Sequence, residues 1–194
     1  MSAAEKVHRA TLADLLAIPE DKRDHEIING ELVKRASPSF DHGDAQMMLG
    51  SDVIRIYGRR PEGKGPGGWW IVADVEILLE ENEIYRPDLV GWRRDRVPTR
   101  PKMWPVDVRP DWVCEILSPS NARNDTIRKM RVYHRAGVPH YWIADPQEQT
   151  LTVYRHSPDG YTVLLIAERG DRVRPEPFTE LELDLAALFG DPDE

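Results

Sequence analysis

The sequence predicts a mixed α/β or α+β domain in which helices flank one central sheet. Segments with the helical period alternate along the chain with short segments rich in β-branched and aromatic residues. The run from Trp112 to Leu117 is almost continuously apolar, which is typical of a strand buried on both faces in the middle of a sheet. The length of 194 residues fits one domain, so we treat residues 1–194 as a single unit.

Residues 1–40 are expected to form an N-terminal helix and a β-hairpin. The helix covers Thr11 to Ile18, because Thr11 is a good N-cap and Pro19 follows the last turn. In His25 to Lys34 apolar and polar residues alternate around Asn29-Gly30, a pair that favours a type I′ turn. A longer helix is predicted next, from Asp41 to Arg59, and its apolar positions are Met47, Met48, Val53, Ile54 and Tyr57.

Residues 69–155 contain the predicted core strands and one helix. Trp69 to Leu79 and Arg86 to Trp92 read as strands that precede the apolar run. Asn121 to Ala136 is predicted as a helix, because Gly137 and then Pro139 follow its end. Three more strands and a closing helix are expected at His140–Ala144, Leu151–Arg155, Tyr161–Ala167 and Leu181–Phe189.

Composition excludes several broad classes of function. The chain is 40% hydrophobic, yet no apolar run approaches the roughly 18–20 residues that span a bilayer. The net charge of -8 argues against a protein that coats DNA or an anionic membrane with its whole surface. The N-terminus lacks the apolar stretch of a signal peptide, and the single cysteine, Cys114, cannot form an internal disulfide. We therefore expect a cytoplasmic protein without a membrane partner.

Two carboxylates stand near the ends of predicted strands. Asp88 begins one strand, and Glu115 interrupts the apolar run of the next. A charge in a buried strand is costly unless it is paired, so Glu115 requires a partner. If the two strands are neighbours, both carboxylates converge, and a divalent cation is a common partner of close carboxylates. We expect Mg²⁺ or Mn²⁺ to be bound by Asp88, Glu115 and the backbone carbonyl of Ile116, and an ion held in this way supports phosphodiester hydrolysis.

Positive charge is concentrated on both sides of Glu115. Residues 93–109 contain six Lys or Arg and two Asp, and residues 121–136 contain five and one. Lys129 lies on the helix that Ser118-Pro119-Ser120 would turn back beside the strand, so its amine is expected to reach the carboxylates. The residues expected to bind a nucleic-acid backbone are Arg93, Arg94, Arg123, Arg128, Arg131 and Arg135.

Four segments resemble one protein family. They are RPDLV at 86–90, WVCEILSPSN at 112–121, Asp-x-x-x-Lys at 125–129 and YHRAGVPHYWIADP at 133–146. Together they resemble the Uma-type family of restriction-endonuclease-like proteins, a former domain of unknown function in the PD-(D/E)XK nuclease superfamily. The resemblance also includes HEIINGELVKRASPSFDHG near the N-terminus and LELDLAALF near the end, so it covers most of the chain.

The resemblance implies a restriction-endonuclease-like fold, a mixed sheet of four to five strands flanked by helices. It also implies Mg²⁺-dependent hydrolysis of DNA and a homodimer. Asp88 matches the first aspartate of the motif and Glu115 the second acid, whereas Leu117 stands where the superfamily has its lysine. Lys129 matches a lysine that the family carries on the following helix. Two further residues that match recurrent family positions, Glu26 and His42, are additional candidates for the catalytic site.

Each candidate also has a purely structural interpretation. Asp88 after Pro87 can be a turn residue that accepts a backbone N–H. Glu115 can form a buried ion pair with Lys129 that has no catalytic role. His42 can simply begin a helix that Asp41 caps, and Glu26 can face solvent from the hairpin.

Two other functions stay open at the level of the sequence. One is a catalytically inactive nuclease fold that binds nucleic acid or protein, which Leu117 in place of the motif lysine favours. The other is a two-carboxylate hydrolase such as a glycosidase. The basic flanks argue against the glycosidase, because a neutral sugar gains nothing from positive charge.

Overall fold

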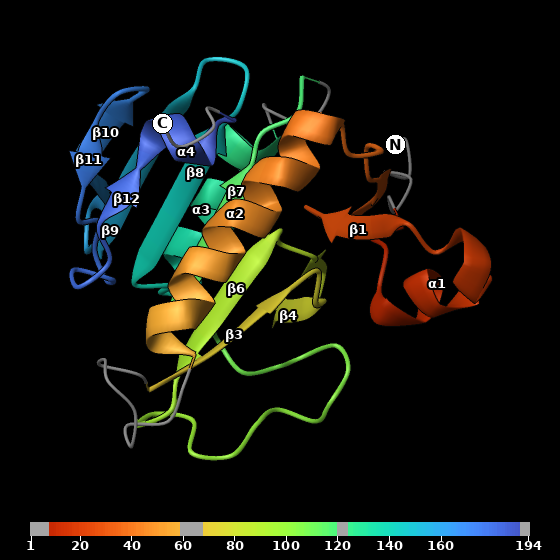
Figure 1. Ribbon diagram of the computed structural model, residues 1–194. Coiled ribbons are helices and arrows are strands. Elements are labelled where there is room, and N and C mark those ends of the chain that lie inside the picture. The colour runs from red at the N-terminus through yellow and green to blue at the C-terminus, as the bar shows by residue number, and fades with distance from the viewer. Residues whose placement is uncertain (1–7, 59–67, 120–123, 191–194) are drawn as a thin grey trace.

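A six-stranded mixed sheet forms the centre of the protein, in the strand order β10-β9-β8-β7-β6-β3 (Figure 1). The structure is a computed structural model that describes residues 8–58, 68–119 and 124–190. The apolar run forms β7 (Trp112–Ile116), and all five of its residues are buried. It pairs in parallel with β8 (His140–Asp145) and antiparallel with β6 (Leu89–Arg93). The prediction of a central strand buried on both faces is therefore confirmed.

The parallel pair β7 and β8 requires a crossover connection, and a helix supplies it. Within the described residues this helix starts as a π-helix, η2 (Asn124–Lys129), and continues as α3 (Met130–Arg135). Gly137 follows with φ of +72°, a conformation that glycine adopts without strain. The predicted helix is thus present, but its first part has an i→i+5 repeat that hydrophobic periodicity does not distinguish from the α form.

Two layers of helix cover the sheet, and alternate residues of β7 face each layer. The long helix α2 (Phe40–Tyr57) crosses one face, where Trp112, Cys114 and Ile116 pack in the first core cluster. On the other face Val113 lies in a second cluster with residues of α3. Glu115 has the same parity as Val113, so its side chain lies on the α3 side of the sheet.

The N-terminal hairpin belongs to a separate four-stranded sheet in the order β2-β1-β5-β4. As predicted, β1 (His25–Ile28) and β2 (Glu31–Lys34) are joined by Asn29 and Gly30, whose φ values of 55° and 76° fit a type I′ turn. The other two strands of this sheet are β4 (Ile77–Glu80) and β5 (Glu83–Tyr85).

This second sheet corrects two predictions. The single strand expected at 69–79 is divided into β3 (Trp69–Ala73) in the central sheet and β4 in the small sheet. The division falls at Asp74, where φ is +53° and the extended chain is interrupted. The expected count of four to five strands in the central sheet is also too low, because the hairpin of β9 (Thr150–Ser157) and β10 (Gly160–Glu168) extends that sheet.

The remaining elements complete the two ends of the chain. Thr11 is the N-cap of α1 (Leu12–Ala17), as the sequence predicts, and it forms a capping box with Asp14. A short 3₁₀ helix, η1 (Glu20–Lys22), precedes the hairpin. The closing helix is shorter than expected: α4 covers Leu185–Leu188, because the preceding residues form the strand pair β11 (Arg172–Val173) and β12 (Leu183–Asp184). No helix among the described residues is long and apolar enough to cross a membrane.

Candidate active site

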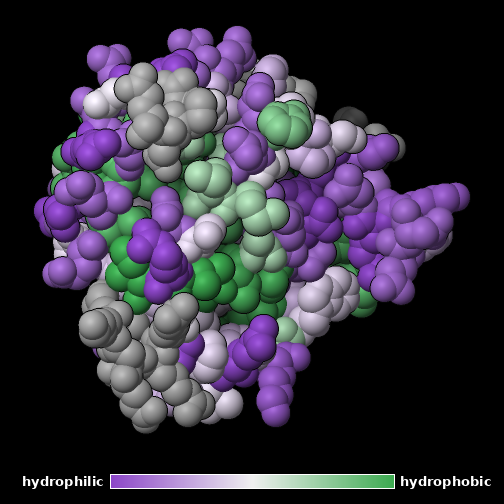
Figure 2. Space-filling view, viewed as in Figure 1, coloured by the Kyte–Doolittle hydropathy of each residue, from purple (hydrophilic) through white to green (hydrophobic). Residues whose placement is uncertain are grey.

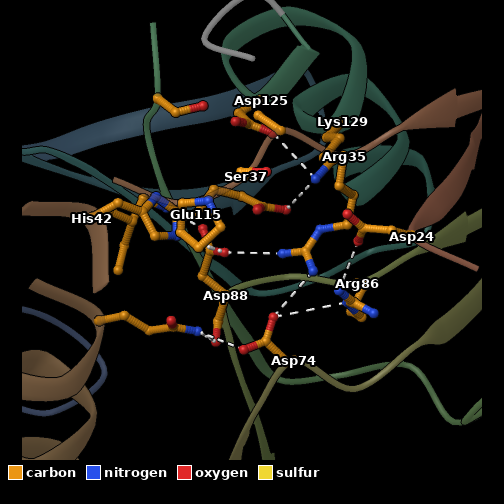
Figure 3. Close-up of a pocket in the computed structure, with 15 residues that line it drawn as sticks. Asp24, Arg35, Ser37, His42, Asp74, Arg86, Asp88, Glu115, Asp125 and Lys129 are labelled. Carbon is orange, nitrogen blue, oxygen red and sulfur yellow. Dashed lines mark hydrogen bonds and ion pairs between the residues drawn. The ribbon is translucent and has the colours of Figure 1, made fainter. Parts of the chain in front are cut away.

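A pocket of about 290 Å³ lies where the carboxyl end of β7 meets the N-terminal sheet and the first turns of α2 (Figure 3). Its lining is strongly polar and includes five carboxylates and three permanently charged cations. The carboxylates are Asp24, Asp74, Asp88, Glu115 and Asp125, and the cations are Arg35, Arg86 and Lys129. The lining therefore contains more acidic groups than Lys and Arg side chains.

The register of the sheet places the two predicted acids opposite one another. Leu89 of β6 faces Cys114 of β7 in an antiparallel pair. Asp88, one residue before Leu89, therefore stands opposite Glu115, one residue after Cys114. Directly opposite residues project from the same face of a sheet, and both side chains line the pocket. The expected convergence of Asp88 and Glu115 follows from this register.

Asp88 is buried, and both of its carboxylate oxygens are engaged. Oδ2 accepts a hydrogen bond of 2.7 Å from the backbone N–H of Ile116. Oδ1 lies 3.3 Å from a guanidinium nitrogen of Arg35 and 3.3 Å from Nε2 of His42. Burial alone would raise the pKa of Asp88, but the hydrogen bond and charge of His42, the Ile116 amide and the charge of Lys129 hold that pKa below its ordinary value. Asp88 is thus kept ionised.

Glu115 is also buried and has two partners, which both contact Oε1. The hydroxyl of Tyr133 donates a hydrogen bond of 2.6 Å, and Nζ of Lys129 lies 3.2 Å away. Burial raises the pKa of Glu115 well above its ordinary value, although the charge of Lys129 opposes this. The two partners explain how a carboxylate can stand in the middle strand of the sheet.

Lys129 reaches the pocket from η2, as its sequence position predicts. Its Nζ lies 3.0 Å from Oε1 of Glu26 and 3.2 Å from Oδ1 of Asp125, in addition to Glu115. Burial lowers the pKa of a lysine, but the carboxylates of Asp125, Glu115 and Glu26 raise the pKa of Lys129 well above its ordinary value. The amine is therefore a fixed cation among three acids.

Glu26 and His42 both belong to the site, which the family resemblance implied without giving their roles. Glu26 faces inward from β1, and its Oε1 accepts a hydrogen bond of 2.7 Å from the backbone N–H of Arg86. His42 lies in the first turn of α2, where Ser39, rather than Asp41, caps the helix by accepting the His42 N–H. The ring then points toward Asp88 (Figure 3). Burial opposes protonation of His42, but Asp88 raises its pKa above the ordinary value.

Among the residues whose side chains form hydrogen bonds or ion pairs with those of Asp88, Glu115 or Lys129, three were given no role at the sequence level: Asp125, Tyr133 and Arg35. Asp125, Lys129 and Tyr133 follow a spacing of four, and this pattern could have indicated one polar stripe facing Glu115. Arg35 follows the hairpin directly, and its guanidinium bridges Asp88 and Asp74. No sequence pattern indicates that bridge, because the two acids lie far from Arg35 in the chain.

The predicted nucleic-acid contacts fall into two groups. Arg128 and Arg131 are exposed on η2 and α3, the helix that carries Lys129; Arg128 lies 3.9 Å from Glu31, and Arg135 of α3 pairs with Glu80 at 3.1 Å. Arg93 and Arg94, in contrast, lie at the end of β6 away from Asp88. Arg94 stacks on Trp70, and Arg93 pairs with Asp95. The structure therefore does not bring Arg93 and Arg94 to the pocket, and Arg123 lies outside the described residues.

The donor set fits a divalent cation that keeps part of its water shell. Among the described residues no group of three or more His, Cys, Asp or Glu side chains forms a ready metal cage. Two carboxylates and a carbonyl are nevertheless enough for Mg²⁺, which retains several waters. The excess of acidic groups over Lys and Arg side chains in the pocket lining favours such an ion. The buried Oδ1 of Asp125 is engaged by Nζ of Lys129 at 3.2 Å.

Comparison with known proteins identifies the family. The model of the Uma2 family, described as "Putative restriction endonuclease", matches residues 12–187. The chain belongs to the Uma2 family. Members of restriction-endonuclease-like families generally use divalent metal ions, which agrees with the acidic pocket of this Uma2 protein.

A solved structure supports the fold. The crystal structure titled as a "putative nuclease belonging to DUF820" from Anabaena variabilis is 24% identical, with a TM-score of 0.73. The match covers 92% of this chain and 97% of that chain, and at this identity it shows the fold. No curated protein matches the sequence. The family and the structural match together confirm the predicted mixed α/β, nuclease-like fold.

Proposed function

We propose that this Uma2 protein is a metal-dependent endonuclease that hydrolyses phosphodiester bonds in DNA. The observation that supports this most directly is that Asp88, directly before β6, and Glu115 of the neighbouring strand β7 line one pocket together with Lys129. Two acids and a cation in one polar pocket are the groups that metal-assisted phosphodiester hydrolysis requires.

Asp88, Glu115 and the carbonyl of Ile116 would hold Mg²⁺ or Mn²⁺. Glu115 would contribute Oε2, because Oε1 already accepts from Tyr133 and contacts Lys129. Bound there, the ion supplies Lewis-acid stabilisation of the phosphate and lowers the pKa of water. Asp88 is held in position by the Ile116 amide and by His42, so the two acids keep a fixed separation.

Lys129 would stabilise negative charge at the reaction centre. The superfamily lysine is replaced by Leu117, which packs against the second core cluster. Lys129 lines the pocket from η2 and keeps its proton, so it provides a cation from a different element. Arg128 and Arg131 would hold the nucleic-acid backbone beside the pocket. We further propose that the protein acts as a homodimer in the cytoplasm, where its buried free thiol, Cys114, stays reduced.

Plasmid cleavage tests this function. We expect supercoiled DNA to be nicked or linearised with Mg²⁺ or Mn²⁺ and left intact with EDTA. Asp88→Asn and Glu115→Gln should each lower the rate by at least ~10²-fold, because each removes one charged ligand. Asp95→Asn is the matched control, since Asp95 is an exposed acid paired with Arg93 at the other end of β6. Circular dichroism should show that both site variants fold.

An inactive binding module is the second candidate, and the three ion pairs that engage Lys129 favour it. In that case DNA binding would persist without cleavage in any metal. Cleavage that survives in both Asp88→Asn and Glu115→Gln would contradict the proposed site.

A further inference from the structure

The outer face of α2 carries large apolar side chains that nothing in the described chain covers. Three of them recur every seven residues, which places them on one line along the helix. Figure 2 shows apolar residues running along this face of the molecule. The exposed fractions are 86% for Phe40, 72% for Met47 and 44% for Ile54. A stripe of this kind is costly in water unless another surface covers it.

An apolar groove runs beside the stripe, between α2 and the ends of β3 and β6. Its volume is about 370 Å³, and Met47, Ile54, Ala73 and Leu89 contribute to its lining. The groove is open because the helix has glycine on this flank: a Cβ built on Gly43 would have no atom within 4 Å. Glycine inside a helix costs stability relative to alanine, so Gly43 weakens α2 and leaves space beside it.

We propose that a second copy of this chain docks on this face, with the two α2 helices antiparallel about a two-fold axis near Met47. This names the interface of the homodimer proposed above, and it holds whether or not the pocket cleaves DNA. In that arrangement Phe40 of each copy lies against the Ile54 end of the partner groove. The residue spacing of seven, two helical turns, is the spacing of a helix–helix seam.

The charges beside the apolar stripe favour a second copy of the chain bound in the antiparallel orientation. Asp41 and Arg55 are exposed at opposite ends of the stripe, and Arg55 also pairs with Asp52 of its own helix at 3.1 Å. An antiparallel pair centred near Met47 places each Asp41 beside the Arg55 of the other copy. A parallel pair would place like charges together, and a two-fold interface must be complementary to itself.

The charges of α2 also argue against a lipid surface. Asp41, Asp44 and Asp52 lie on this helix with a single Lys or Arg, Arg55. Helices that lie on anionic membranes are instead rich in Lys and Arg on their polar side. The face is therefore better matched to a protein surface of mixed charge, which the chain itself provides.

Sedimentation equilibrium of the full chain, without DNA, tests the proposal. We expect a dimer for the wild type and a monomer for Met47→Asp. Gly43→Leu should raise the dimer dissociation constant at least about tenfold, because it fills the groove. Its thermal stability should not fall, because a Cβ at this position meets no atom within 4 Å and alanine-like residues favour the helix over glycine. Ile166→Asp is the control: Ile166 is 67% exposed on β10, outside this face.

Charge reversal distinguishes the antiparallel pair from other contacts. Asp41→Arg and Arg55→Asp should each weaken the dimer, and the double variant should restore it. A monomeric wild type at about 100 µM, well above the Kd of a specific dimer, would overturn the proposal. So would a dimer that Ile166→Asp dissociates and Met47→Asp does not. Dimerisation is measured without DNA, so a monomeric wild type would not contradict the proposed nuclease activity. Likewise, an absence of DNA cleavage would not contradict the proposed dimer.

Discussion

Lys129 lies 3.0–3.2 Å from one oxygen of each of three buried acids, those of Glu26, Glu115 and Asp125. Three buried carboxylates around one point repel one another, and a single ammonium group offsets only part of that repulsion. The stability of the fold should therefore change when either the Lys129 ammonium group or one of the three carboxylates loses its charge. This sensitivity leads to two predictions at the scale of single residues.

Replacement of Lys129 by an apolar residue should destabilise the fold strongly. Lys129→Met leaves three buried carboxylates without their cation, and breaking a buried ion pair in this way costs about 3–5 kcal/mol. Urea unfolding monitored by circular dichroism measures the change. Adding Glu26→Gln to Lys129→Met should recover part of the loss. If Lys129→Met unfolds at the wild-type midpoint, the amine is not neutralising these acids.

Asp125 should make stability depend on pH. Burial, with the charge of Glu26, raises the pKa of Asp125 from 3.8 to about 6, although Lys129 opposes this. An acid with a raised pKa stabilises the fold below the unfolded pKa, and this contribution is lost as pH rises through the folded value. Between pH 4 and pH 7 the loss is roughly 2–3 kcal/mol.

Asp125→Asn removes this titration. The free energy of unfolding of Asp125→Asn minus that of the wild type should therefore rise by roughly 2–3 kcal/mol between pH 4 and pH 7. Urea titrations at several pH values in EDTA measure the difference, since EDTA prevents a bound metal from changing the charge balance. A constant difference between the two proteins across this range would contradict the prediction.

The C-terminal segment before α4 places a large aromatic side chain, Phe178, in the core of the central sheet. Phe178 is fully buried, and its ring lies 4.8–5.6 Å from the rings of Tyr57, Trp69, Trp112 and Trp142. These partners come from α2 and from three strands. Phe178 therefore connects the segment to both α2 and the sheet.

Phe178→Ala should lower the free energy of unfolding by about 3–5 kcal/mol, because it leaves a cavity among four large rings. Phe178→Leu, which keeps most of the volume, should cost less than half of that. Ile166→Ala, at an exposed position on β10, is the control and should change stability by less than about 1 kcal/mol. A similar loss for Phe178→Ala and Ile166→Ala in urea unfolding would show that the ring cluster does not hold this segment.

Elements determined by local chemistry could be predicted from the sequence, whereas those determined by distant pairing could not. The Asn29-Gly30 turn and the apolar run of β7 depend on their own residues, and both are present. The split at Asp74 depends instead on β4 leaving the central sheet to pair with β5, which contacts the N-terminal hairpin. Nothing within residues 69–79 specifies that partner.

The candidate site follows the same division. Asp88 and Glu115 could be predicted because acids stand out near the ends of apolar strands. Lys129 needed the turn at 118–120 and the family resemblance, and Arg35 was missed because its partners are 39 and 53 residues away. Arg93 and Arg94 were grouped with the site because they are close in sequence to Glu115. They lie, however, at the opposite end of the extended strand β6 from Asp88.

Charge is divided unevenly over the whole molecule. The chain carries a net charge of -8, yet Arg128 and Arg131 are exposed on the helix that carries Lys129. A body of this charge repels DNA at long range, so binding must come from local contacts with phosphates. Each phosphate contact releases counterions, and binding therefore weakens as salt increases.

The salt dependence of DNA binding should identify which arginines make these contacts. For Arg128→Ala with Arg131→Ala, we expect the slope of log Kobs against log salt to become shallower by about 2, since each phosphate contributes about 0.9. Arg93→Ala should leave the slope unchanged, because Arg93 lies at the other end of β6 and pairs with Asp95. Fluorescence anisotropy with labelled duplex DNA in Ca²⁺ measures all three proteins without cleavage. A slope that changes for Arg93→Ala but not for the double variant would contradict this prediction. It would place the nucleic-acid surface at the opposite end of the sheet from Asp88 and Glu115, so DNA binding would not bring a phosphate to the proposed active site.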